Sequence, residues 1–139
     1  MKTFLELALH LAALAQLAIA LLNFSLVPLM GWKPELARLP LLIREVFQVH
    51  LFFISITVGL FAILTWRFAH QMAFSADPLA AWLATGIGIF WATRSVMQWT
   101  NYSTGHWRGN ATRTALHVLL FFGYGALGAV YLAAGLFPR

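Results

Sequence analysis

Four long apolar stretches limit what this chain can fold into more than any other feature of its sequence. They cover residues 3–25, 42–69, 78–102 and 113–136. Because an α-helix rises about 1.5 Å per residue, each stretch is long enough to cross a hydrocarbon core of about 30 Å. Within a bilayer, a helix also satisfies its own backbone hydrogen bonds. We therefore predict an all-α polytopic membrane protein, in which residues 1–139 form one antiparallel bundle of four transmembrane helices.

The composition agrees with this fold class. Hydrophobic residues make up 61% of the chain and charged residues only 9%, whereas soluble domains carry about 25% charged residues. Nine lysines and arginines against four acids are typical of charges at lipid headgroups rather than of a nucleic-acid interface. We expect membrane lipids as partners, no nucleic acid, and a location in the bacterial inner (plasma) membrane.

The connections between the stretches also carry signals. Pro28, Gly31, Pro34 and Pro40 interrupt the segment after the first stretch, so no long helix can form there. Trp32 begins a short amphipathic run in this segment, and we predict that it forms a short interfacial helix between the first and second spans.

A polar connection is predicted for residues 70–78. Its last two residues, Asp77 and Pro78, are typical of a helix start, because proline fits the first helical turn.

Arg94 is the most costly residue of the third stretch, at about 2.5 kcal/mol or more on membrane-insertion scales. At about 100° per residue, it shares one helix face with Trp91, Gln98 and either Asn101 or Tyr102. We predict that this face points into the bundle rather than toward lipid.

Polar residues of the other stretches are expected to converge on Arg94. In an antiparallel bundle, Glu45, Gln48, Arg94, Gln98 and His117 all fall in the same half of the membrane. We expect Glu45 or Gln48 to be the partner of Arg94, with His117 nearby. Such convergence at one depth indicates a functional site more strongly than scattered polar residues do.

Small residues predict where helices approach closely. Gly86 and Gly88 permit close backbone approach in the third stretch. In the fourth, Gly125, Ala129 and Ala133 repeat every four residues, which is typical of a tight helix contact.

Two kinds of lipid-soluble redox ligand fit the polar cluster. A quinone would use hydrogen-bond donors for its carbonyls and aromatic rings for its ring. Haem b would take His50 and His117 as iron ligands, with Arg94 meeting a propionate. The candidate ligand-binding residues are Glu45, Gln48, Trp91, Arg94, Gln98, Tyr102 and His117.

The sequence is compatible with three functions. The favoured one is an accessory or anchoring subunit of a membrane complex, associated with other membrane subunits or with copies of itself, that binds quinone or haem b. In a purely structural variant of that reading, the cluster is a satisfied network without ligand. The alternative is a small oligomeric transporter or proton pathway that uses Arg94, Glu45 and His117. We expect no enzyme activity from the chain on its own, since no nucleophile with a base and no metal-binding spacing stands out.

Overall fold

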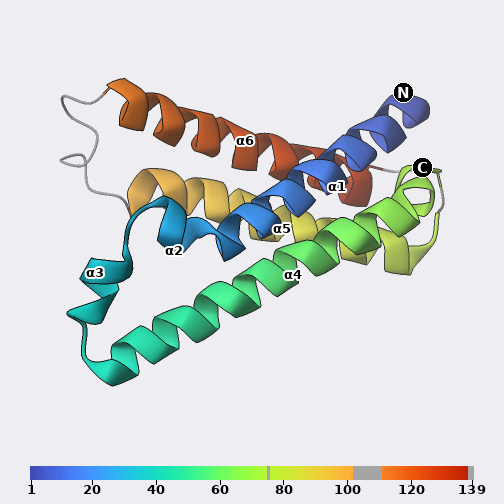
Figure 1. The fold of residues 1–139 in the computed structure, drawn as a ribbon. Helices are drawn as coiled ribbons and strands as arrows, with labels where there is room; N and C mark the ends of the chain where they lie inside the picture. The colour runs from blue at the N-terminus through green and yellow to red at the C-terminus, as the bar shows by residue number, and fades with distance from the viewer. Residues whose placement is uncertain (75, 102–110, 138–139) are drawn as a thin grey trace. The chain divides into compact units, whose positions relative to one another are not determined.

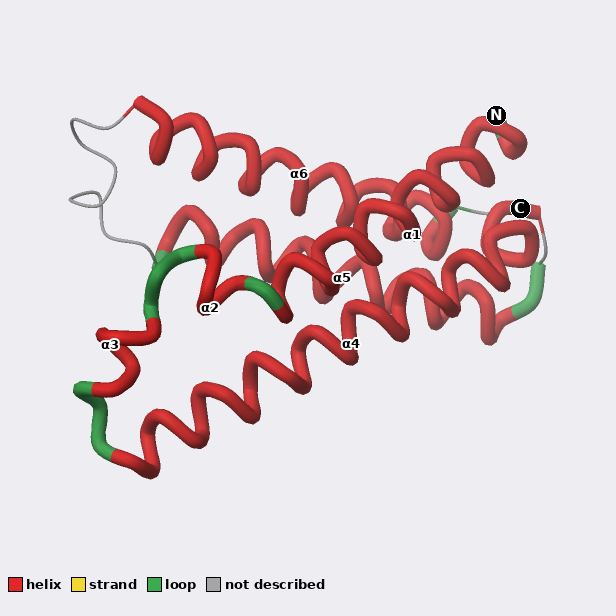
Figure 2. Tube along the Cα trace, in the orientation of Figure 1, coloured by secondary structure: helices red, strands yellow, loops and turns green. Residues whose placement is uncertain are grey.

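The protein is helical throughout the part that the structure describes. This structure, a computed structural model, describes residues 1–74, 76–101 and 111–137, without the side chains of residues 112 and 113. Its elements are α1 (Lys2–Phe24), α2 (Leu26–Leu29), α3 (Lys33–Ala37), α4 (Leu41–Phe74), α5 (Pro78–Thr100) and α6 (Ala111–Leu136) (Figure 1). The described loops between them are short (Figure 2). The all-α prediction is confirmed.

Three helices are long and apolar enough to cross a membrane: α1, α4 and the part of α6 from Thr114 to Leu136. Helix α5 has 23 residues, the same length as α1. It is not apolar enough by the same measure, because Arg94, Ser95 and Gln98 lower its hydropathy. Three of the four predicted spans are therefore long and apolar enough to cross a membrane, and the bundle of four spans stays a prediction.

Helix α4 is longer than its sequence predicts. It has 34 residues and ends at Phe74, so the predicted polar connection is wrong for residues 70–74. Neither glycine nor proline occurs between Arg67 and Asp77, and nothing breaks the helix there. The last turns also bury one face, through Ala69, Met72 and Ala73.

The predicted start of α5 is confirmed. Asp77 is its N-cap, and the Asp77 carboxylate accepts a hydrogen bond from the Leu79 backbone N–H at 3.0 Å. This satisfies one of the N–H groups that a helix leaves unpaired at its first turn. Pro78 follows in the first helical turn, where its missing N–H costs nothing.

Two short helices occupy the connection between α1 and α4. Helix α3 lies where the interfacial helix is predicted, and it buries Leu36. Its exposed Arg38 contacts Glu35 at 3.3 Å. Helix α2 precedes it, and Gly31 lies between the two with a φ of 67°, a left-handed conformation that glycine adopts without strain.

The chain divides into two compact units, residues 10–67 and residues 1–9 with 68–139, and each is described by itself. Within residues 10–67, α1 runs antiparallel to α4. The rings of Phe24 and Phe52 lie 5.8 Å apart, and those of His10 and Trp66 4.9 Å apart. Ala20 is the neighbour of Gly59 between these two contacts.

In the other unit, α5 and α6 run antiparallel and side by side (Figure 1). Three glycines allow their backbones to approach closely. A Cβ atom would lie 2.9 Å from the Leu132 nitrogen if built on Gly88, 3.0 Å from the Ala92 nitrogen if built on Gly128, and 2.8 Å from the Thr85 nitrogen if built on Gly135. Real Cβ contacts are essentially never shorter than 3.0 Å, so Gly88 and Gly135 require glycine, whereas a side chain at Gly128 would need the Ala92 backbone to shift slightly.

The predicted contact row on α6 is corrected by this geometry. Gly125 does face α5, since its Cβ position lies 3.4 Å from the Ser95 hydroxyl oxygen. Ala129 is exposed, and Gly128 and Gly135 make closer contacts than Gly125. Steps of four residues turn about 40° around a helix each time, so a row of such steps leaves the partner. Alternating steps of three and four residues stay on one side.

Candidate functional site

The site is built on the face of α5 that packs against α6. The buried residues of α5 are Ala80, Ala84, Ile87, Gly88, Trp91, Ser95 and Gln98. Their steps of three and four residues keep them on one side of the helix. Small and apolar residues fill the first half of this face, and polar side chains fill the second. The polar groups therefore collect near the C-terminal end of α5 and the N-terminal half of α6.

A chain of hydrogen bonds joins three of the predicted residues. Arg94 Nη1 donates to Gln98 Oε1 at 3.1 Å, one helical turn further along α5. Gln98 Nε2 lies 3.0 Å from His117 Nδ1 on α6. Gln98 is 2% exposed and His117 8% exposed, so the link between the helices is shielded from the surroundings. Ser95 adds a second link, since its hydroxyl donates to the Phe121 carbonyl oxygen at 2.9 Å.

The direction of this chain fixes the protons on His117. Arginine has donors only, so the oxygen of the Gln98 amide must face Arg94. The amide nitrogen of Gln98, which also has donors only, then faces His117. His117 Nδ1 must therefore accept, which leaves the ring proton on Nε2.

Aromatic rings surround the charged end of the chain. The Arg94 guanidinium carbon lies 4.8 Å from the centroid of the Tyr124 ring, within the range of a cation–π interaction worth about 0.5–2 kcal/mol. Trp91, which is one of the predicted residues, stacks on Tyr124 in turn, with the ring centroids 5.3 Å apart and their planes at 25°. The ring system thus helps to hold an arginine that would be costly in lipid.

An apolar groove borders this cluster. We call it the α5–α6 groove; it has a volume of about 530 Å³ and is lined by Val96, Trp99, Thr100, Val118, Phe121 and Phe122. Trp99 forms its link to the polar chain, because the Trp99 ring stacks on His117 at 6.1 Å and 26° and lies 5.4 Å from the Phe121 ring. The chain of hydrogen bonds therefore supports one wall of the groove.

The remaining predicted residues belong to the other unit or lie outside the described residues. Glu45, Gln48 and His50 are on α4, in the unit of residues 10–67, and all three side chains are exposed. The expectation that Glu45 or Gln48 is the partner of Arg94 stays a prediction. Tyr102 lies outside the described residues.

The two histidines proposed for haem differ in the role of Nδ1. His50 Nδ1 lies 2.8 Å from the Val46 carbonyl oxygen; a carbonyl only accepts, so Nδ1 carries a proton. A metal-ligating histidine typically donates its second N–H in this way. In His117 the proton is on Nε2 instead. Among the described residues, no three histidine or acidic side chains form a metal site.

Sequence reasoning missed two residues of the site, Ser95 and Trp99. Ser95 could have been found, because it lies four residues after Trp91 and three before Gln98 on the same buried face. Trp99 could not, since it is 64% exposed and its role depends on the position of His117 on another helix.

Comparison of the chain with protein-family models, with curated proteins and with solved structures gives no significant match. The function is therefore argued from the site alone.

Proposed function

We propose that the protein is a small non-catalytic membrane subunit that binds a lipid-soluble, ring-bearing ligand of the quinone class in the α5–α6 groove. The observation that carries the proposal is the Arg94–Gln98–His117 chain directly behind Trp99, in which Gln98 and His117 are buried and Arg94 is half-buried. Packing alone would need neither a preorganised aromatic wall nor a polar chain beneath it. Other membrane subunits or further copies of the chain are the partners that this role implies.

The proposal takes α5 as the fourth membrane span. Its 23 residues correspond to about 35 Å of helix, which is enough for a hydrocarbon core of about 30 Å. Its costly polar residues face α6 rather than lipid: Ser95 and Gln98 are buried, and Arg94 bonds to Gln98. Intramembrane polar residues are tolerated in this arrangement.

The α5–α6 groove suits a quinone head group in size and chemistry. Ligand pockets typically measure about 300–1,000 Å³ and are mostly apolar with a few polar groups. Trp99 and Phe121 offer flat surfaces on which a ring can stack. Thr100 is the polar side chain of the lining. Its hydroxyl lies 3.1 Å from the Val96 carbonyl oxygen and 2.9 Å from Asn101 Oδ1, so its one proton would have to leave these acceptors to bond a ring carbonyl.

The haem hypothesis and the proton-pathway hypothesis fit the described site less well than the quinone hypothesis. Haem b would need an unprotonated Nε2 on His117, and the chain places the proton there. A proton pathway would need titrating groups in sequence, but the central member of the chain is Gln98, whose amide does not take up and release protons. We therefore propose a quinone rather than haem b as the ligand.

Fluorescence quenching tests the proposal. The full-length protein in nanodiscs is titrated with a short-chain benzoquinone, and saturable quenching is expected on binding to the α5–α6 groove. Val118→Trp fills the groove and should abolish saturation. Leu119→Trp is the matched control, since Leu119 is the next residue, is 67% exposed and does not line the groove.

The Gln98→Leu variant tests the hydrogen bonds that Gln98 makes behind the Trp99 wall of the groove. It should weaken quinone binding without filling the groove, because His117 and the stacked Trp99 lose their support. Equal quenching of the wild type and of the Val118→Trp variant by the benzoquinone would refute the quinone proposal. Co-purification of a stoichiometric partner protein that contacts Val118 and Phe122 would instead assign the groove to a protein contact.

A further inference from the structure

Helix α4 indicates where the unit of residues 10–67 meets the membrane surface. Residues 46–66 contain no acidic residue, lysine or arginine, and at about 1.5 Å per residue they span roughly 30 Å, the thickness of a hydrocarbon core. Arg67 is the first charged residue after this segment. Trp66 precedes it, and tryptophan is enriched at the level of the headgroups. A membrane span of residues 46–66 would therefore place Arg67 at a membrane boundary.

A second apolar groove ends at this boundary. We call it the α1–α4 groove; it has a volume of about 410 Å³. Its floor is made of buried small residues, Ala13 from α1 and Ala62 from α4. Its walls are the exposed apolar side chains of Leu14, Leu17 and Ile63.

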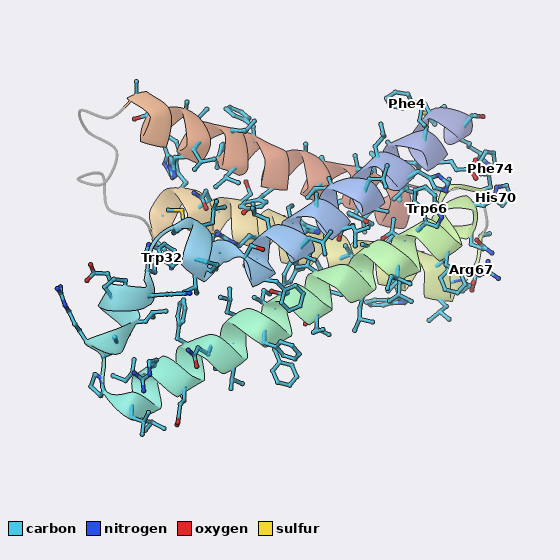
Figure 3. The ribbon with its side chains drawn as sticks, viewed as in Figure 1. Phe4, Trp32, Trp66, Arg67, His70 and Phe74 are labelled. Carbon is cyan, nitrogen blue, oxygen red and sulfur yellow. The ribbon has the colours of Figure 1, made fainter. Side chains whose placement is uncertain are left out.

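One end of the α1–α4 groove carries an aromatic ring and a positive charge. Trp66 and Arg67 line it there, on the C-terminal part of α4 (Figure 3). The Trp66 ring is held edge-on by His10, with centroids 4.9 Å apart and planes at 87°. An apolar channel with a cation at its membrane-boundary end matches a molecule that has an aliphatic chain and an anionic head.

We propose that the α1–α4 groove binds one phospholipid with an anionic headgroup, whose acyl chain lies against Leu14, Leu17 and Ile63 and whose phosphate contacts Arg67. Arginine suits this role because its planar guanidinium can form two parallel hydrogen bonds to a phosphate. The small residues of the floor let the acyl chain lie closer to the helices than ordinary boundary lipid. This site is independent of the quinone proposal, since it uses other residues and another ligand.

Native mass spectrometry of the full-length protein in detergent tests the lipid site. The protein is titrated with phosphatidylglycerol and with phosphatidylcholine of identical acyl chains. We expect one bound phosphatidylglycerol, with an affinity about fivefold higher than that for phosphatidylcholine, the effect of one cation near an anionic headgroup. Inorganic phosphate should not displace it, because phosphate has no acyl chain for the groove.

Matched variants locate the site. Arg67→Gln should remove the preference, whereas Arg44→Gln, at the other end of the same helix, should keep it. Ile63→Ala should weaken binding of both lipids, and Ile56→Ala, the same change outside the groove, should not. Equal affinity for the two lipids in the wild type would overturn the proposal without any variant. Equal losses in the two arginine variants, or displacement by inorganic phosphate, would overturn it too.

Discussion

Two buried serines, one in the α1–α4 pair of residues 10–67 and one in the α5–α6 pair, bond to different kinds of partner. On α4, Ser55 donates to the Leu51 carbonyl oxygen at 2.6 Å, four residues earlier in the same helix. On α5, Ser95 donates to Phe121 of α6 at 2.9 Å. A hydrogen bond within one helix satisfies a polar group whichever helix packs against it. A hydrogen bond between helices forms with only one neighbouring helix in one register.

The helix backbones also pack less closely in the α1–α4 pair than in the α5–α6 pair. A Cβ atom on Gly59 of α4 would lie 3.9 Å from the nearest atom, the Ala20 Cβ, which is an ordinary contact. The corresponding position on Gly88 of α5 lies 2.9 Å from the Leu132 nitrogen. The α5–α6 pair is therefore specified both by glycine packing and by polar links, and sequence changes should affect it more strongly.

The largest difference is expected for glycine substitutions. Gly88→Ala should destabilise the protein by about 1–3 kcal/mol, because the added methyl group overpacks the contact with Leu132. Gly86→Ala is the control two residues away. No atom lies within 4 Å of its Cβ position, so it should be neutral or stabilising by up to about 1 kcal/mol through helix propensity.

Thermal unfolding in detergent, followed by circular dichroism, measures both changes. Gly59→Ala extends the comparison to α4 and should be tolerated. If Gly86→Ala and Gly59→Ala were as damaging as Gly88→Ala, the α5–α6 contact would not be the specific one.

The next largest effect is expected at Gln98. Gln98→Leu should cost about 1–3 kcal/mol, because Arg94 and His117 each lose a buried hydrogen-bond partner. Thr57→Val is the control from α4; Thr57 donates to the Phe53 carbonyl oxygen of its own helix at 2.8 Å, so its loss should cost less than about 0.5 kcal/mol. A Gln98→Leu variant with wild-type stability in the same unfolding assay would contradict a structural role for the chain.

A pair of serine substitutions should give the smallest difference. Ser95→Ala removes a bond between helices, and such bonds in membrane proteins average about 0.6 kcal/mol. Ser55→Ala removes a bond within α4 and should be neutral or slightly stabilising. Both serines are buried, at 6% and 1% exposure, so burial does not explain a difference. Chemical unfolding of the two variants side by side can resolve it, and equal stabilities would count against the comparison.

Helix positions and part of the site could be predicted from the sequence. Long apolar runs, together with Asp77 and Pro78 as a helix start, are local signals. Arg94 and Gln98 were found because their spacing of four residues puts them on one face of a single helix. The same local reasoning ended α4 too early, since the polar residues His70 and Gln71 look like a loop but continue the helix on its exposed side.

Interactions between helices were harder to predict. His117 was expected near Arg94, but the atoms that meet depend on the rotation of α6 about its axis, which a hydropathy pattern does not fix. The contact row on α6 was misplaced for the same reason, because Gly125 and Gly128 differ by about 60° around the helix. The groove beside Trp99 depends on this rotation as well.

The tautomer of His117 tests the central claim, that the Arg94–Gln98–His117 chain joins α5 to α6. Solid-state ¹⁵N NMR of histidine-labelled protein in bilayers reports which ring nitrogen carries the proton, and a His117→Gln variant identifies the His117 signals among the five histidines. We predict a proton on Nε2 and none on Nδ1, with the proton moving to Nδ1 in Gln98→Glu, where a carboxylate accepts instead. A proton on Nδ1 of His117 in the wild type, unchanged by Gln98→Glu, would contradict the chain.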